Sequence, residues 1–369
     1  MDTSSEIIHA LLPLFLTTTL GASVALVGLI DGISESTAAI GKVFSGYISD
    51  RIGKRKPLIL FGYGLAAISK PLFALATSPM FVLAARFADR IGKGLRGAPR
   101  DALIADVTPE AIRGRAYGLR QALDTVGAFV GPLLAIALMA LFNDNMRAVF
   151  WIAIIPAIIS VSLVVLGVED RDTAEQTRAP IRLHDLSSLP PKFWLLMSIA
   201  AVFTFARFSE AFLILKANAD GLPVMLAPLV LVVMNVVYAL GAYPAGAMAD
   251  RTSPRSLLMM GIAVLIAADL VLWLGSSLAG AFTGIALWGA HMALTQGVFA
   301  KLVADIAPER LRASAFGIFN LLTGVALLIA SVLAGLVWDK FGSGATFLTG
   351  ALLAATAAVT VILTSPKPT

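Results

Sequence analysis

Charged side chains interrupt the apolar segments of this sequence at positions where they could carry chemistry. Glu6 and Glu210 each follow a serine, and Arg207 precedes Glu210 by three residues. A carboxyl group removed from water holds its proton more tightly, whereas a nearby arginine favours the ionised form. An arginine can also exchange its carboxylate partner for an anionic substrate. We therefore expect Glu6 or Glu210 to carry a proton.

Further charges lie on segments that also read as helices. Asp89 and Arg90 follow Arg86 by three and four positions and so share one face of a helix with it, while Arg120 and Asp124 are four apart and can pair directly. A charge at mid-membrane costs about 2.5–3.5 kcal/mol, so each needs a partner or a wet cavity. A buried structural ion pair is the alternative for every one of them. The predicted proton and substrate site comprises Glu6, Glu35, Arg86, Asp89, Arg90, Asp124, Arg207 and Glu210.

The segments that must position these residues are almost wholly apolar. Hydrophobic residues make up 58% of the 369 residues and charged residues 14%, against roughly 25% charged residues in soluble domains. About twelve membrane-spanning helices fit this length. The sequence thus predicts an all-α membrane protein, with helices at 3–20, 24–48, 57–76, 79–103, 114–141, 147–168, 192–217, 223–248, 256–275, 279–304, 313–338 and 345–364.

One short pattern occurs twice in the chain, about 200 residues apart. Gly46–Arg51 returns as Gly246–Arg251, and Pro109-Glu110 returns as Pro308-Glu309. Two like membrane halves are typical of transporters whose substrate site lies between them. We predict two pseudo-symmetric six-helix bundles, at 1–168 and 192–369, joined by a cytoplasmic linker at 169–191.

The repeated pattern also carries a family resemblance. Residues 46–56 resemble the loop 2–3 signature of the major facilitator superfamily, G-x-x-x-D-R-x-G-[RK]-[RK]. Gly46 would permit close helix approach and Asp50 would cap a helix or pair with an arginine. The resemblance implies a cytoplasmic gate, with simple anchoring by basic residues as the alternative. The expected gate residues are Gly46, Asp50, Arg51, Gly53, Arg55, Gly246, Asp250 and Arg251.

Two further helices resemble this family. Gly118, Gly127 and Gly131-Pro132 are similar to the helix-5 motif G-x8-G-x3-G-P-x2-G-G, which is associated with proton-driven exporters, although its final glycine pair is absent here. Arg86 matches the arginine that the family's helix-4 pattern implicates in proton coupling. An ordinary packing face is the alternative for the helix-5 glycines.

Basic residues gather in alternate loops and so predict the topology. They lie in 51–56, 113–115, 171–182, 251–255 and 310–312, which places both termini and the linker in the cytoplasm. We expect a monomer in a bacterial cytoplasmic membrane. The first residues lack the basic start and cleavage site of a signal peptide. Either the first helix is unusually short or the chain starts inside it.

Together these features predict a secondary transporter that works by alternating access, with a small molecule, protons and lipid as its partners. Proton-coupled efflux is preferred because of the helix-5 resemblance, and an anionic or amphiphilic substrate is preferred because arginine is concentrated in the helices. The alternatives are an importer of a nutrient or metal chelate and, more remotely, a receptor that does not transport. The sequence contains no nucleotide-binding loop, no cysteine and no HExxH-like or nucleophile–base cluster, so we expect no enzyme, no cofactor and no metal site. Its dispersed charge of +5 argues against nucleic-acid binding.

Overall fold

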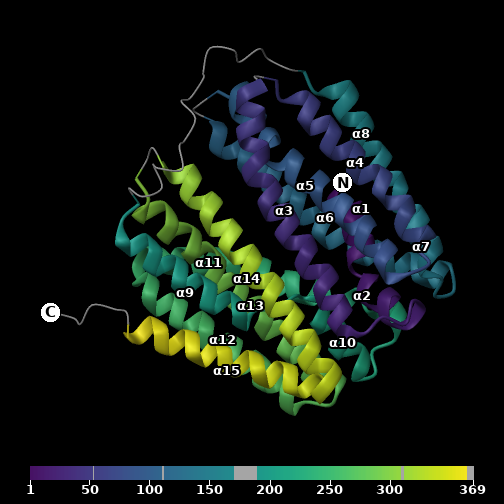
Figure 1. Cartoon of the computed structure of the whole chain (residues 1–369), viewed down its shortest axis with the longest axis vertical. Helices are drawn as coiled ribbons and strands as arrows, with labels where there is room; N and C mark the ends of the chain where they lie inside the picture. The colour runs from purple at the N-terminus through teal and green to yellow at the C-terminus, as the bar shows by residue number, and fades with distance from the viewer. Residues whose placement is uncertain (53, 110–111, 170–188, 309–310, 364–369) are drawn as a thin grey trace. The chain divides into compact units, whose positions relative to one another are not determined.

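The computed structural model of the chain is built of helices joined by short connections (Figure 1). It describes all residues except 53, 110–111, 170–188, 309–310 and 364–369. Within those residues there is no β-strand. The predicted all-α fold is therefore confirmed.

The elements follow the predicted segments in order. The first half of the chain contains α1 (Asp2–His9), α2 (Leu12–Leu14), the π-helical η1 (Phe15–Thr19), α3 (Val24–Ile52), α4 (Lys56–Leu75), α5 (Pro79–Val107), α6 (Arg113–Leu141), α7 (Met146–Ile152) and α8 (Ile154–Gly167). The second half contains α9 (Pro191–Ala206), α10 (Ala211–Ala219), the 3-10 turn η4 (Val224–Leu226), α11 (Leu229–Arg251), α12 (Pro254–Leu274), α13 (Leu278–Ile306), α14 (Arg312–Phe341) and α15 (Ser343–Leu363).

Three segments predicted as single helices are broken. The first helix stops at His9 and the sixth at Ile152, each four residues before a proline. Pro13 and Pro156 have no N–H to donate to those carbonyls, so the regular hydrogen-bond pattern ends there. The seventh helix breaks between Ala206 and Ala211, where no proline is present.

Contacts between helices divide the chain into two units. The first comprises Met1–Ala22 and Ile33–Pro180, and the second comprises Ser23–Gly32 and Ile181–Thr369. In the first, α4 packs on α5 and α1 packs on α6; in the second, α12 packs on α13 and α15, and Figure 1 shows α15 running along α12. These units resemble the predicted halves except at Ser23–Gly32, so the bundle boundaries remain a prediction.

The two units repeat the same helix pair. Gly62 of α4 faces Gly92 of α5, where an added Cβ would lie 2.7 Å from the Gly92 carbonyl oxygen. Gly261 of α12 faces His291 of α13 in the same way, with a Cβ 3.7 Å from the His291 carbonyl oxygen. Gly261 lies 199 positions after Gly62, and His291 lies 199 positions after Gly92. The duplication seen in the sequence is therefore also present in the packing.

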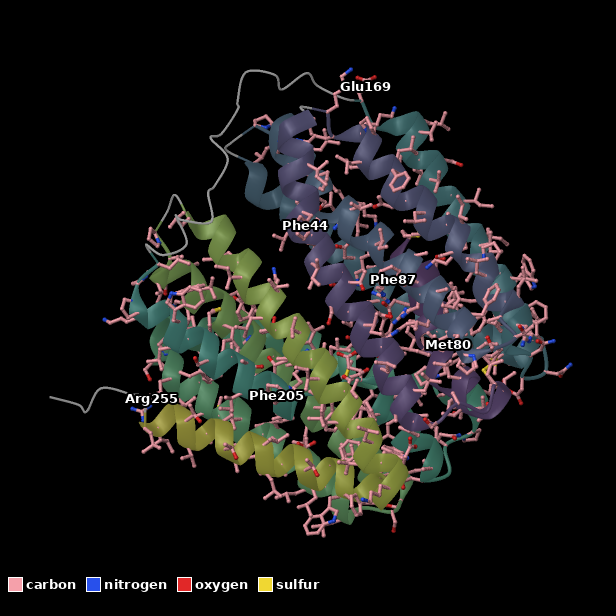
Figure 2. The ribbon with its side chains drawn as sticks, viewed as in Figure 1. Phe44, Met80, Phe87, Glu169, Phe205 and Arg255 are labelled. Atoms are coloured by element: carbon pink, nitrogen blue, oxygen red, sulfur yellow. The ribbon has the colours of Figure 1, made fainter. Side chains whose placement is uncertain are left out.

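The helices have the length and surface of membrane spans. Among the described residues, ten stretches are long and apolar enough to cross a bilayer, while α5 carries many charges and the first segment is broken. Large apolar side chains are exposed on the first unit: Phe44 at 60%, Met80 at 62% and Phe87 at 44% (Figure 2). Surfaces of this kind are stable in lipid rather than in water.

Candidate proton and substrate site

Asp89 of α5 forms the centre of a buried charge cluster in the first unit. Its side chain is 2% exposed, and its Oδ1 lies 2.7 Å from Lys70 Nζ. Its other oxygen lies 3.7 Å from Arg90 Nε, and Arg86 acts on it electrostatically. Lys70 also donates to Ser5 Oγ at 2.9 Å. Three cations from α4 and α5 therefore surround one carboxylate.

Glu35 of α3 is a second carboxylate of this cluster. Its Oε1 lies 3.3 Å from Arg90 Nη1, and its side chain is 37% exposed, unlike that of Asp89. Lys93 and Arg86 also act on it electrostatically. Arg86 donates a hydrogen bond to His9 Nδ1. Because a guanidinium has only donors, Nδ1 must accept, which places the proton of neutral His9 on Nε2.

The glycines of the helix-5 motif bring α6 against the part of α1 that carries Glu6. An added Cβ on Gly131 would lie 2.6 Å from Glu6 Cβ, and one on Gly127 would lie 3.1 Å from Asp2 Cβ. Glu6 is partly exposed and interacts electrostatically with Lys93. These glycines thus form a close-packing face, as the alternative reading of the motif expects, and the face holds Glu6 near Lys93 of α5. We call Glu6, Glu35, Lys70, Arg86, Asp89, Arg90 and Lys93 the Asp89 cluster.

Asp124 belongs to a group of charges at α6 that also includes Asp2 of α1, with which its side chain shares a hydrogen bond. Arg120 Nη2 lies 2.7 Å from Asp124 Oδ2, so the predicted pairing within this helix is confirmed. Arg100 Nη2 lies 3.5 Å from the same oxygen, and Asp101 contacts both arginines at 3.4–3.5 Å. The four side chains are 22–41% exposed. An ion-pair network explains these residues without a further role.

Arg96 is more deeply buried than its place near the cytoplasmic end of the predicted helix suggested. The residue is 3% exposed. Its Nη2 lies 4.0 Å from Asp2 Oδ1, and its guanidinium carbon lies 4.9 Å from the centre of the Tyr63 ring. It therefore joins the charged interior of the first unit.

Arg207 and Glu210 lie in the second unit, at the break between α9 and α10. Glu210 acts electrostatically on Arg207, as does Tyr238 of α11. Ser209 ties the irregular backbone to its surroundings, because its N–H donates to Ser331 Oγ at 3.1 Å and its Oγ accepts from the Ala211 N–H at 3.1 Å. Irregular backbone at membrane depth is stable only where protein or water satisfies it in this way.

Six of the predicted gate residues lie outside the part of the structure whose side chains are described: Gly46, Asp50, Arg51, Gly53, Asp250 and Arg251. The same holds for Gly118 of the helix-5 motif. Arg55 is described, and it donates to Ser49 Oγ at 2.8 Å. Gly246 has no heavy atom within 4 Å of an added Cβ. Pro132 of the helix-5 motif is buried within α6.

Lys70 and Lys93 of the Asp89 cluster are absent from the site predicted from sequence, as are His9 and Asp269. His9 lies three residues after Glu6 on the same short helix, a spacing that places both on one face. Asp269 of α12 is fully buried and follows Lys70 by 199 positions. Aligning the two halves position by position would have found Asp269.

Comparison with known proteins identifies the family that this arrangement represents. The model of the Major Facilitator Superfamily matches residues 1–237 and 217–369. The chain belongs to the major facilitator superfamily. It is therefore a multi-pass membrane transporter, and the prediction of a twelve-helix major facilitator fold is confirmed.

Individual relatives of this transporter differ in how much of it they cover. An uncharacterized MFS-type transporter of Methanocaldococcus jannaschii is 31% identical over 359 residues, which cover 96% of this chain and 89% of that protein. The multidrug resistance protein MdtH of Edwardsiella ictaluri is 33% identical over 121 residues, or 33% of this chain and 30% of that protein. The crystal structure of the nucleoside transporter NupG has a TM-score of 0.81, with 14% identity over 98% of this chain and 95% of that one. This last likeness shows the fold alone.

Proposed function

We propose that this transporter exports a small amphiphilic molecule in exchange for protons. The observation that supports this most strongly is the contact of the helix-5 glycines with α1, which holds Glu6 within the Asp89 cluster. In the family resemblance, those glycines belong to proton-driven exporters. The partial likeness to a multidrug resistance protein is consistent with export.

Glu6 is the preferred proton carrier in the first unit. Asp89 is enclosed by Lys70 and Arg90, whereas Glu6 is partly exposed and shares Lys93 with Glu35. Protonation of Glu6 would leave Glu35 as the only one of these two carboxylates that attracts Lys93, and it would make the net charge of the cluster more positive by one. A proton and a cationic amphiphile would therefore compete for Glu6, which is the requirement for exchange.

The same electrostatics support import of an anion as a second candidate function. Among the described residues the Asp89 cluster holds four cationic side chains and three carboxylates. A substrate carboxylate or phosphate would balance the excess charge and could take an arginine from its partner. Protonation of Glu6 would favour such an anion, so proton and substrate would move together. The two candidate functions thus differ in the sign of their coupling.

Transport in proteoliposomes with a pH-sensitive dye inside separates these functions. A panel of amphiphilic cations and of carboxylate- or phosphate-bearing anions would be added outside. Exchange makes the lumen more alkaline as substrate enters, and co-transport makes it more acidic. We expect alkalinisation with amphiphiles, lost in Glu6→Gln and kept in Glu169→Gln, a change at an exposed residue after α8. Unaltered coupling in both Glu6→Gln and Glu210→Gln would reject carboxylate-based coupling at these positions.

Conformation and topology complete the proposal. The six-helix bundles at 1–168 and 192–369 would alternate access as a monomer, with Gly46–Arg55 and Gly246–Arg251 forming a cytoplasmic gate. Both termini would face the cytoplasm of a bacterial cell. The chain has no cysteine, so single cysteines introduced at Lys54 and Asp144 can be labelled without background. Labelling of Lys54→Cys in intact cells by an impermeant reagent would contradict this orientation, as would protection of Asp144→Cys.

A further inference from the structure

Asp269 lies inside the second unit and has no salt bridge to a described residue. Its side chain is 0% exposed, and neither carboxylate oxygen has a hydrogen-bond partner among the residues that the structure describes. An ionised carboxylate is among the most costly groups to bury in this way. Ionisable groups inside membrane helices are also rare unless they have a function.

The first unit shows how a buried charge is satisfied at the corresponding position. Lys70 occupies this position in α4 and pairs with Asp89 of α5. Moving 199 positions along the chain replaces Lys70 by Asp269 and Asp89 by Trp288. The second copy has therefore exchanged an ammonium for a carboxyl group and has an indole where the first has the countercharge. Trp288 is itself fully buried, and its Nε1 has no hydrogen-bond partner in the described structure.

The surroundings of Asp269 are apolar and tightly packed. A methyl group on Gly350 of α15 would lie 2.7 Å from Asp269 Oδ2 and 3.1 Å from a ring carbon of Phe208. The Phe208 ring centre lies 5.5 Å from those of Trp288 and Phe347. Little room is left for water at the carboxyl group, because the Gly350 backbone approaches it closely and aromatic rings lie nearby.

Other titratable groups on the neighbouring helices do not balance an ionised Asp269. Arg207, which precedes Phe208, interacts electrostatically with Glu210. His291 of α13 is fully buried, and neither ring nitrogen has a hydrogen-bond partner in the part described. Lys301 and Asp305 of α13 lie ten or more residues beyond His291, about 15 Å or more along the helix. The described titratable residues of α11 are Tyr238 and Tyr243, and α15 has none. Arg255 bonds the Ile362 carbonyl, and Lys216, which reaches Gly275, is paired with Asp220 at 2.7 Å.

We propose that Asp269 is a proton-binding site of the second unit, separate from Glu6 and Glu210. The carboxyl group carries its proton while α12, α13 and α15 are packed around it, and it releases the proton only when water reaches it. The site follows from the packing of this unit alone. It does not depend on the direction of transport or on the proposed exchange mechanism.

Infrared spectroscopy of the purified full-length protein tests this directly. A protonated carboxyl group has a carbonyl stretching band that is distinct from the bands of a carboxylate and that shifts in heavy water. At about pH 7 an exposed aspartic acid keeps its proton in about one molecule in a thousand. We expect the wild-type protein to show the band at this pH and Asp269→Asn to lose it. Asp220→Asn is the matched control, because Asp220 is ion-paired with Lys216 and should leave the band in place.

A second variant keeps the proposal testable if Asp269→Asn does not fold. Gly350→Ala retains the acid but places a methyl group against it, so the band should move in frequency without disappearing. An identical band in wild type and Asp269→Asn would overturn the proposal. So would the absence of any acid band in the wild type, or a band unmoved by Gly350→Ala where Asp269→Asn cannot be measured.

Discussion

Lys70 Nζ lies 2.7 Å from Asp89 Oδ1 in the first unit, with the two side chains 1% and 2% exposed. Neither charge could remain at this depth without the other, because the desolvation of one ion costs several kcal/mol. The pair also determines where Arg90 can go, since this residue reaches both Asp89 and Glu35. A structural ion pair thus supports the residues to which we assign transport.

Removal of one member of this pair should be more harmful than removal of both. Lys70→Met or Asp89→Asn leaves the opposite charge buried and should lower the free energy of unfolding by about 3–5 kcal/mol. The double variant Lys70→Met/Asp89→Leu removes both charges and should recover most of that loss. Unfolding of the purified variants in a denaturant series measures the difference. Additive losses in the double variant would show that the two residues are not coupled.

Gly131 should not tolerate even one methyl group. In Gly131→Ala the new Cβ would lie 2.6 Å from Glu6 Cβ and 3.0 Å from the Thr3 carbonyl oxygen, so α1 and α6 must separate. We expect a loss of about 1–3 kcal/mol in stability together with weaker proton coupling. Gly64→Ala in α4 is the control, because no heavy atom lies within 4 Å of its Cβ position. A Gly131→Ala protein that matches Gly64→Ala in both measurements would show that this contact has no role.

The sequence allowed some of these contacts to be predicted and concealed others. Arg120 and Asp124 pair as expected, because a spacing of four on one helix determines their contact whatever the rest of the fold does. Pairs between helices are different: nothing in the sequence alone selects Lys70 as the partner of Asp89. The break of the seventh helix was also missed, since Arg207–Glu210 contains neither proline nor glycine. Ser209 stabilises that break through Ser331, a residue more than a hundred positions away.

Asp124 was included in the predicted proton site, but its surroundings favour a structural role. Its side chain is 26% exposed and paired with Arg120 and Arg100, and exposed pairs contribute little to stability. Asp124→Asn should therefore cost no more than about 1 kcal/mol and should leave the dye response in proteoliposomes unchanged, in contrast to Glu6→Gln. Loss of coupling in Asp124→Asn with normal stability would return this residue to the transport site.

The proposed proton on Asp269 also makes stability depend on pH. In the unfolded chain this residue ionises near pH 4, as a free aspartic acid does. Above that pH the folded protein holds one more proton than the unfolded chain, so raising the pH lowers the free energy of unfolding by about 1.4 kcal/mol per pH unit. The effect continues until Asp269 ionises within the fold. The Asp269→Asn side chain binds no proton in the folded or the unfolded state, so this contribution to the pH dependence of stability is absent from that variant.

Unfolding of the two proteins between about pH 5 and pH 7 measures the term, since contributions shared by both cancel. The stability of the wild type relative to Asp269→Asn should fall by about 2.7 kcal/mol over this range if the proton is held throughout. Asp220→Asn should show no comparable change, because Asp220 is paired with Lys216. Parallel profiles for wild type and Asp269→Asn would mean that folding takes up no proton at Asp269, as expected for a carboxylate that is ionised in both the folded and the unfolded protein.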